Sequence, residues 1–478
     1  MIIRNSFLSF LASASILRLV IAGGNGNDHP VPNEKQLKDE IVRIPVIDLG
    51  PWYDSVVNSP IDREVTEPLS PKLSTEQQDI VQRIRLACRE VGFFQITGVP
   101  DSRNNDGKNN GTGLVKIMEQ TWKASRDFFD LPNDEKLEHT TEDNTKYPYG
   151  YERSETLVRG KLLDREDGDI GCDGGDDKFC ASSEAIADLK ETFALGPPDG
   201  NGSGMPPRRW INSPNVSPDF RLALEAYYER MEDVALVLLE IFAIALEESA
   251  DFFRDKMDHH MSALRLVHYY PLGKDPMEIH GETHKASLED SGPIQRLVRA
   301  GAHTDYGALT ILAAQDEGLE VLLRDKTRAS DGGGGGGDEN NDIQGYRQTW
   351  YPVPLVPGAF IVNLGDLMQR WTNNEWISTM HRVVMPSTKA QERRYSMAYF
   401  VNINGDTPIE PLKCCQGGGS GDFHHNNHVI TAGEHLMAKH LASMGITIGN
   451  DDKAENISEH CDTMGESYSG LDRCRDQS

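Results

Sequence analysis

The chain has 478 residues, of which 38% are hydrophobic, and it carries a formal net charge of -27 at pH 7. This length is enough for roughly one to three domains with a hydrophobic core. The acidic excess argues against nucleic acid as a partner, because a polyanion would be repelled. A small metabolite is the expected partner.

The amino terminus is expected to be a targeting segment. Residues 1–22 combine Arg4 with a mainly apolar stretch from Phe7 to Ala22, and no acidic residue occurs among them. This pattern fits a cleaved secretory signal or an organellar presequence, and both addresses stay open beside a cytoplasmic location. Because Arg18 interrupts the apolar run, no stable membrane insertion is expected. With the polar residues that follow, 1–42 is interpreted as a targeting segment and linker.

The seven cysteines show no CxxC or zinc-ribbon spacing. Cys172 and Cys180 flank a Gly/Asp-rich loop and could form a disulfide in an oxidising compartment, so their pairing stays open. The odd number of cysteines and the size of the chain argue against a dense disulfide framework.

The globular part begins with an alternating strand at 44–49. Ser74 and Gln77 then form a capping-box signal for a helix, which Gly92 ends before a strand at 93–97. A second helix is predicted at about 114–129. The next helix is the longest, with Ser217 as its N-cap and Pro218 at its first helical position. Its apolar residues recur at helical spacing, which predicts a support packed along a sheet.

From Leu264 onward the pattern changes to short strands separated by turns. The predicted strands are 265–270, 309–313, 359–363, 380–385 and 395–403. Short strands in the second half of a chain favour a sandwich or jelly roll, with the earlier helices braced outside it.

The expected organisation is therefore a mixed α/β (α+β) chain in three parts after the linker. Residues 43–262 form a helical and strand region, 263–444 the strand-rich core, and 445–478 a polar, disordered tail. Segment 325–342, with its six consecutive glycines, is expected to be a flexible surface loop. Three other insertions are similar in kind: 165–181, 272–298 and 414–427.

The chemistry of the strand-rich half is expected at His303, Asp305 and His381. On a strand, the i, i+2 spacing of His303 and Asp305 points both side chains to one face, and His381 would arrive from a distant strand. Two imidazoles and one carboxylate are the ligand set of a mononuclear non-haem iron oxygenase, in which further metal positions stay open. An isolated HxD is more often an ordinary polar pair, so its context decides.

Other polar residues follow in order along the same half. Arg394 offers a planar fork of donors suited to a carboxylate. Ser396, two residues on, would share its strand face, and the apolar flanks of the pair predict a half-buried strand. Asn363 and Asp366 lie before the strand of His381 and are interpreted as structural.

The ordered series resembles the isopenicillin-N-synthase-like branch of the Fe(II)/2-oxoglutarate-dependent dioxygenases. The match covers most of residues 43–441 and includes Pro45-Val46-Ile47-Asp48-Leu49, Val91-Gly92-Phe93-Phe94, His303-Thr304-Asp305, His381 and Arg394-Tyr395-Ser396. The resemblance implies a double-stranded β-helix (jelly-roll) core braced by N-terminal helices, one of them long.

The resemblance also assigns roles to single residues. It implies that His303, Asp305 and His381 bind Fe(II), that Arg394 and Ser396 hold the distal carboxylate of 2-oxoglutarate, and that Tyr270 contacts this co-substrate. Position 268 departs from the family, whose plant members usually carry Asn there, whereas this chain has His268. His268 is interpreted as a polar core residue rather than a ligand.

The implied activity uses Fe(II), 2-oxoglutarate and O2. Oxidative decarboxylation to succinate and CO2 would be coupled to hydroxylation or desaturation of a small molecule by a monomeric enzyme. Two alternatives stay open: an Fe(II)/O2 oxidase of the same family that does not use 2-oxoglutarate, and a catalytically silent binding protein on this fold.

Overall fold

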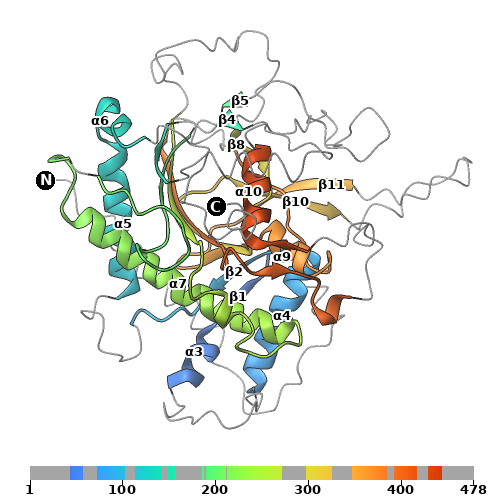
Figure 1. Cartoon of the computed structure of the whole chain (residues 1–478). Coiled ribbons are helices and arrows are strands. Elements are labelled where there is room, and N and C mark those ends of the chain that lie inside the picture. The colour runs from blue at the N-terminus through green and yellow to red at the C-terminus, as the bar shows by residue number, and fades with distance from the viewer. Residues whose placement is uncertain are drawn as a thin grey trace, which may run out of the picture.

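Two β-sheets form the centre of the fold in the computed structural model (Figure 1). The structure describes residues 44–57, 73–102, 113–140, 149–153, 156–157, 186–187, 190–211, 213–271, 298–325, 347–384, 392–416 and 429–443. Several predictions lie outside the described residues: the targeting segment and linker, the glycine run, the Cys172–Cys180 pair and the polar tail.

The larger sheet has eight strands, and all its neighbours are antiparallel except the pair β1–β2. Its strands, in spatial order, are β1 (Val46–Asp48), β2 (Phe93–Thr97), β12 (Phe360–Leu364), β9 (Leu309–Ala314), β14 (Arg394–Val401), β7 (Ala263–Tyr269), β6 (Lys190–Leu195) and β3 (Gly150–Glu152).

The second sheet has four antiparallel strands. They are, in order, β11 (Arg347–Pro352), β10 (Leu319–Asp325), β13 (His381–Val384) and β8 (Val298–His303). Two short pairs complete the strands of the described residues: β15 (Pro408–Ile409) with β16 (Ile430–Thr431), and β4 (Thr156–Leu157) with β5 (Ile186–Ala187).

Helices cover one face of the larger sheet. α5 (Leu114–Phe129) and α4 (Thr75–Glu90) both contact the long α7 (Asp219–Ala245), and α7 also contacts β14 (Figure 1). Their buried apolar side chains join those of the sheet in one large core. The remaining helices are α3 (Gly50–Val57), α6 (Asn133–Leu137), α9 (Asp366–Trp371) and α10 (Ala432–Ser443), with 3-10 turns at Arg254–Lys256 and Lys413–Cys415.

A second, smaller core lies between the two sheets. The larger sheet contributes residues of β2, β7 and β12, and the smaller sheet contributes residues of β8, β10 and β13. The members include Phe93, Val267, Tyr269, Ile361, Ala300, Val321 and Val383. The larger sheet is therefore buried on both faces, by helices on one side and by the second sheet on the other.

The predicted capping box at the start of α4 is confirmed, whereas α7 begins one residue later than predicted, with Pro218 rather than Ser217 as its N-cap. The Ser74 hydroxyl accepts from the Gln77 amide at 3.2 Å, and the Gln77 side chain accepts from the Ser74 amide at 3.0 Å. At the start of α7 the Ser217 hydroxyl accepts from the Asp219 amide at 3.2 Å. The five predicted strands of the second half are present as β7, β9, β12, β13 and β14, whereas β6, β8, β10 and β11 were not predicted.

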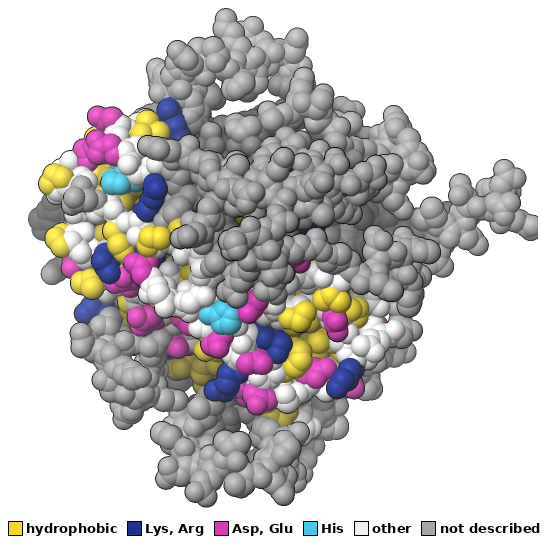
Figure 2. All heavy atoms as spheres, viewed as in Figure 1, with side chains coloured by type: hydrophobic (Ala, Val, Ile, Leu, Met, Phe, Trp, Pro, Cys, Tyr) yellow, Lys and Arg dark blue, Asp and Glu magenta, His cyan; other side chains and the backbone are white. Residues whose placement is uncertain are grey.

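The described surface carries side chains of every kind. On the face seen in Figure 2, acidic, basic and hydrophobic side chains are interspersed. In the ranges that the structure describes, no helix is both long enough and apolar enough to span a bilayer.

Candidate metal centre

Three side chains meet where β8 and β13 pair. His303 is the last residue of β8 and His381 the first of β13, and the two are direct partners across the antiparallel ladder. Asp305 Oδ1 lies 3.9 Å from His303 Nε2 and 3.7 Å from His381 Nε2. The candidate ligand atoms of the three residues all lie within 4.8 Å of one another. His303 and Asp305 do not share a strand, because β8 ends at His303 and Asp305 lies in the irregular segment between β8 and β9.

Each imidazole is oriented by a backbone carbonyl. His303 Nδ1 lies 2.8 Å from the Gly301 oxygen, and His381 Nδ1 lies 3.1 Å from the Thr379 oxygen. A carbonyl can only accept, so Nδ1 carries the hydrogen in both rings and Nε2 keeps its lone pair for a metal. The His303 side chain is 29% exposed and that of His381 only 9%, so the centre opens to solvent on the His303 side.

The Asp305 carboxylate is held by two other strands. Its Oδ2 accepts from Thr310 Oγ1 at 2.5 Å and from Asn363 Nδ2 at 2.6 Å, and these donors are register partners on β9 and β12. Oδ1 is left to face the imidazoles. Asn363, predicted as a structural residue, thus supports the candidate ligand Asp305, and Thr310 is a second supporting residue that was not predicted. The available signal was the position of Asn363 in an apolar strand, where a buried amide needs a partner.

This donor set fits a divalent first-row metal. Two imidazoles and one carboxylate, each with its orientation fixed by a further hydrogen bond, provide three ligands and leave other metal positions open. Phe93 packs edge-on against His381, with ring centroids 5.3 Å apart, and so adds an apolar wall from β2.

Arg394 and Ser396 lie on the face of β14 that looks into the core between the sheets. Both are buried, and the guanidinium of Arg394 lies over the ring of Tyr269, with Cζ 4.7 Å from the ring centroid. Arg394 Nε donates to the carbonyls of Asp316 at 3.3 Å and Glu317 at 3.1 Å. Its Nη1 is buried and has no hydrogen-bond partner among the described residues.

An anion fits beside Arg394. A buried, charged N–H group without an acceptor is costly, and a carboxylate would satisfy it. The guanidinium of Arg299 lies close enough to feel the positive charge of Arg394. Burial and then this charge lower the pKa of Arg299 to about 10. Two neighbouring cations in this core would favour a ligand with more than one negative charge.

Tyr270 and His268 lie in a different environment from Arg394. Tyr270 follows the end of β7, and burial and then the charge of Glu191 raise its pKa. Both His268 nitrogens are engaged, Nδ1 with Glu191 at 2.6 Å and Nε2 with Arg393 at 2.8 Å, so His268 is a polar core residue and no ligand. Because Tyr269 is the aromatic residue over Arg394, it joins the candidates for the co-substrate contact, and the role of Tyr270 stays a prediction.

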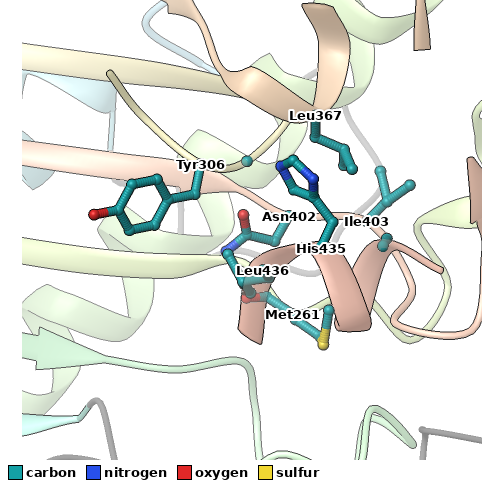
Figure 3. A pocket seen from close by; sticks show the side chains of 9 residues that line it. Met261, Tyr306, Leu367, Asn402, Ile403, His435 and Leu436 are labelled. Atoms are coloured by element: carbon teal, nitrogen blue, oxygen red, sulfur yellow. Dashed lines mark hydrogen bonds between the residues drawn. The ribbon is translucent and has the colours of Figure 1, made fainter. Parts of the chain in front are cut away.

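A small hollow is lined by Tyr306 and by residues of α10 (Figure 3). It lies between α10, Tyr306 and the residues after β14, including Asn402. His435 of α10 points into it, and its buried Nε2 has no partner among the described residues. Burial and the charge of Lys439 lower the pKa of His435 to about 4, although its hydrogen bond to the Tyr306 backbone acts in the other direction. At neutral pH His435 therefore offers an acceptor to this hollow.

Comparison with known proteins decides the family. Residues 261–403 match the family model of the 2OG-Fe(II) oxygenase superfamily, and residues 44–219 match that of the non-haem dioxygenase in morphine synthesis N-terminal. A 2-oxoglutarate-Fe(II) type oxidoreductase of Metarhizium rileyi is 30% identical over 332 residues, which are 68% of this chain and 75% of the relative. The chain belongs to the 2OG-Fe(II) oxygenase superfamily. This oxygenase is thus a 2-oxoglutarate-dependent dioxygenase, an oxidoreductase with iron as its metal and 2-oxoglutarate as its co-substrate.

Other relatives of the oxygenase agree. A validamycin A dioxygenase of Streptomyces hygroscopicus is 29% identical, over 83% of this chain and 86% of the relative. Among solved structures, a full-length Neurospora crassa protein in complex with alpha-KG shares the fold, with a TM-score of 0.55 and 22% identity over 84% of this oxygenase and 96% of that chain.

Proposed function

We propose that this oxygenase couples the oxidative decarboxylation of 2-oxoglutarate to succinate with hydroxylation or desaturation of a small molecule. In this proposal His303, Asp305 and His381 hold Fe(II), while Arg394 and Ser396 hold the distal carboxylate of 2-oxoglutarate. The observation that carries these assignments is the buried, unpartnered Nη1 of Arg394 in the same core between the sheets that the triad adjoins.

The residues supply orientation and charge. Iron and 2-oxoglutarate, when bound, provide the oxidising chemistry. The Gly301 and Thr379 carbonyls keep both Nε2 lone pairs directed at the metal, and Thr310 and Asn363 fix the orientation of the Asp305 carboxylate. Arg394 neutralises the far end of the co-substrate.

The architecture supports the same proposal. We infer that the two facing sheets form the double-stranded β-helix of the family, with α4, α5 and α7 bracing its outer face. A small-molecule substrate is supported by solved neighbours such as the Neurospora crassa protein, whose complexes contain thymine or 5-formyluracil. In this chain His435 and Tyr306 line a hollow, and Tyr306 directly follows Asp305 in the sequence. Both residues are candidates for the part of the site that recognises the substrate.

One titration tests the proposed function and the role given to Arg394. The protein is mixed anaerobically with Fe(II), with and without 2-oxoglutarate, the visible charge-transfer absorption is recorded, and succinate is measured after air is admitted.

The proposal expects a 2-oxoglutarate-dependent band and succinate from the wild type. Arg394→Ala should lose the band while it retains iron. The control is Arg230→Ala, which removes another buried arginine, 5% exposed, from the helical layer and should keep the band. If the wild type gives neither band nor succinate, the proposed function is wrong. If Arg394→Ala loses its iron, the role given to Arg394 is wrong.

A further inference from the structure

A cluster of buried charges lies on the sheet face opposite to Arg394. Glu191 of β6 has a fully buried side chain, and its Oε2 accepts from Lys136 Nζ at 2.7 Å and from the Tyr151 hydroxyl at 2.6 Å. Lys136 belongs to α6, and its side chain is only 4% exposed. Burial by itself would raise the pKa of Glu191, but the hydrogen bonds from His268 and Lys136 and the charge of Lys136 lower it. Glu191 is thus a buried carboxylate.

His268 connects this carboxylate to β14. Its Nδ1 lies 2.6 Å from Glu191 Oε1 and donates to it, and its Nε2 accepts from Arg393 Nε at 2.8 Å. The ring also stacks on Tyr395, with centroids 4.8 Å apart and planes at 21°. The imidazole is consequently neutral and held from three sides.

Arg393 immediately precedes β14, beside Arg394. Its guanidinium also pairs with Asp130 at the end of α5. Since successive strand residues point to opposite faces, Arg393 reaches the helical side while Arg394 reaches the core between the sheets. The register of β14 on β7 pairs Arg394 with Tyr269 and Tyr395 with His268. A slip of one residue would exchange the faces of Arg393 and Arg394.

We propose that the hydrogen-bonded chain Glu191–His268–Arg393 is a positioning device for Arg394. It fixes the register of β14 against β7 and so keeps the Arg394 guanidinium directed at the distal carboxylate of 2-oxoglutarate. Apolar contacts are non-directional and would tolerate a small shift of the strand. The hydrogen bonds that join the carboxylate, the imidazole and the guanidinium are directional, so they form in only one register of β14 on β7. The proposal rests on the role of Arg394 given under the proposed function.

Two variants interrupt the hydrogen bonds of Glu191–His268–Arg393, one at the buried His268 and one at the partly exposed Arg393. His268→Phe keeps an aromatic ring on Tyr395 and removes both hydrogen bonds. Arg393→Met keeps the stem and removes the donors at a side chain that is 37% exposed, so this variant is expected to fold even if His268→Phe does not. Both should raise the Kd for 2-oxoglutarate by about 10- to 100-fold, as for residues that orient a ligating group. The Kd for Fe(II) should change less than about twofold.

Two further variants separate positioning from general loss of stability. In His268→Gln the amide can donate to Glu191 and accept from Arg393, and it should restore most of the affinity. Leu266→Ala removes a fully buried side chain from the same face of β7, two residues away, and should lower the melting temperature without raising the Kd for 2-oxoglutarate.

The measurement is an anaerobic titration of the Fe(II) protein with 2-oxoglutarate, followed by the charge-transfer absorption, with iron binding measured separately. An unchanged Kd in folded Arg393→Met overturns the proposal, as does an equal rise in Leu266→Ala. If the wild type shows no band, the proposed function fails as well. A wild type that binds 2-oxoglutarate and variants that bind it equally well reject the positioning role alone.

Discussion

Removal of the two donors to Asp305 should weaken iron binding without altering the ligands themselves. Asn363→Leu and Thr310→Val keep approximately the volume of each side chain and remove the hydrogen bonds of 2.6 Å and 2.5 Å to Oδ2. Hydrogen bonds to a charged group contribute about 1.5–3 kcal/mol. Because both bonds exist with and without metal, iron binding should lose only part of this amount.

The expected loss in Fe(II) affinity is about 10- to 100-fold for each variant, or about 1.4–2.7 kcal/mol. Since both donors share one oxygen, the double variant should lose less than the sum of the two single losses. Competition with a chelator under anaerobic conditions measures the affinity. Thr121→Val is the matched control, because this buried hydroxyl of α5 bonds to the Ile117 and Ala223 carbonyls in the helical layer. Iron affinities of both variants within twofold of the wild type would refute the reasoning.

Three further results are expected. Gly92 has φ +69°, and an added Cβ would collide with the Ile377 carbonyl, so Gly92→Ala should lower the free energy of unfolding by more than about 1 kcal/mol; a melting temperature equal to the wild type would contradict this. Burial lowers the pKa of His435 from 6.5 to about 4, so the unfolded chain binds its proton more tightly and stability should fall as the pH drops from about 6.5 to about 4. Thermal unfolding at pH 7 and pH 5 should show a smaller loss for His435→Leu, and an identical loss would remove His435 as the cause. Lys439→Met breaks the 2.7 Å ion pair with Asp366. Because Lys439 is 43% exposed, the free energy of unfolding should fall by at most about 1 kcal/mol, and iron binding should be unchanged. Loss of iron would show that α10 supports the metal ligands.

The sequence predicted the strands β13 and β14, which begin at His381 and Arg394, because their apolar patterns are local. The strand β8, which ends at His303, was not among the predicted strands. The hydrogen-bond partners of the site residues depend on the register between neighbouring strands, and the apolar/polar alternation within one strand does not specify that register. Asn363 reaches Asp305 only because β12 pairs with β9 so that Asn363 lies opposite Thr310.

β6 was missed for a related physical reason. Its sequence begins with Lys190, Glu191 and Thr192, which read as solvent-exposed, yet all six residues of the strand are buried. The charge of Glu191 is tolerated there because Lys136 and His268 come from elements far away in the sequence. Burial of a charge depends on such remote partners, so a window of neighbouring residues cannot reveal it.

The contact between the start of the fold and the metal site has a consequence for folding kinetics. The Thr379 hydroxyl donates to the Val91 carbonyl at 2.6 Å across a separation of 288 residues, and Phe93 packs against His381. Contacts between segments so distant in sequence form slowly, because a long loop must close first. The iron site should therefore be assembled late during refolding, and the rate at which iron affinity returns should follow the slowest folding phase.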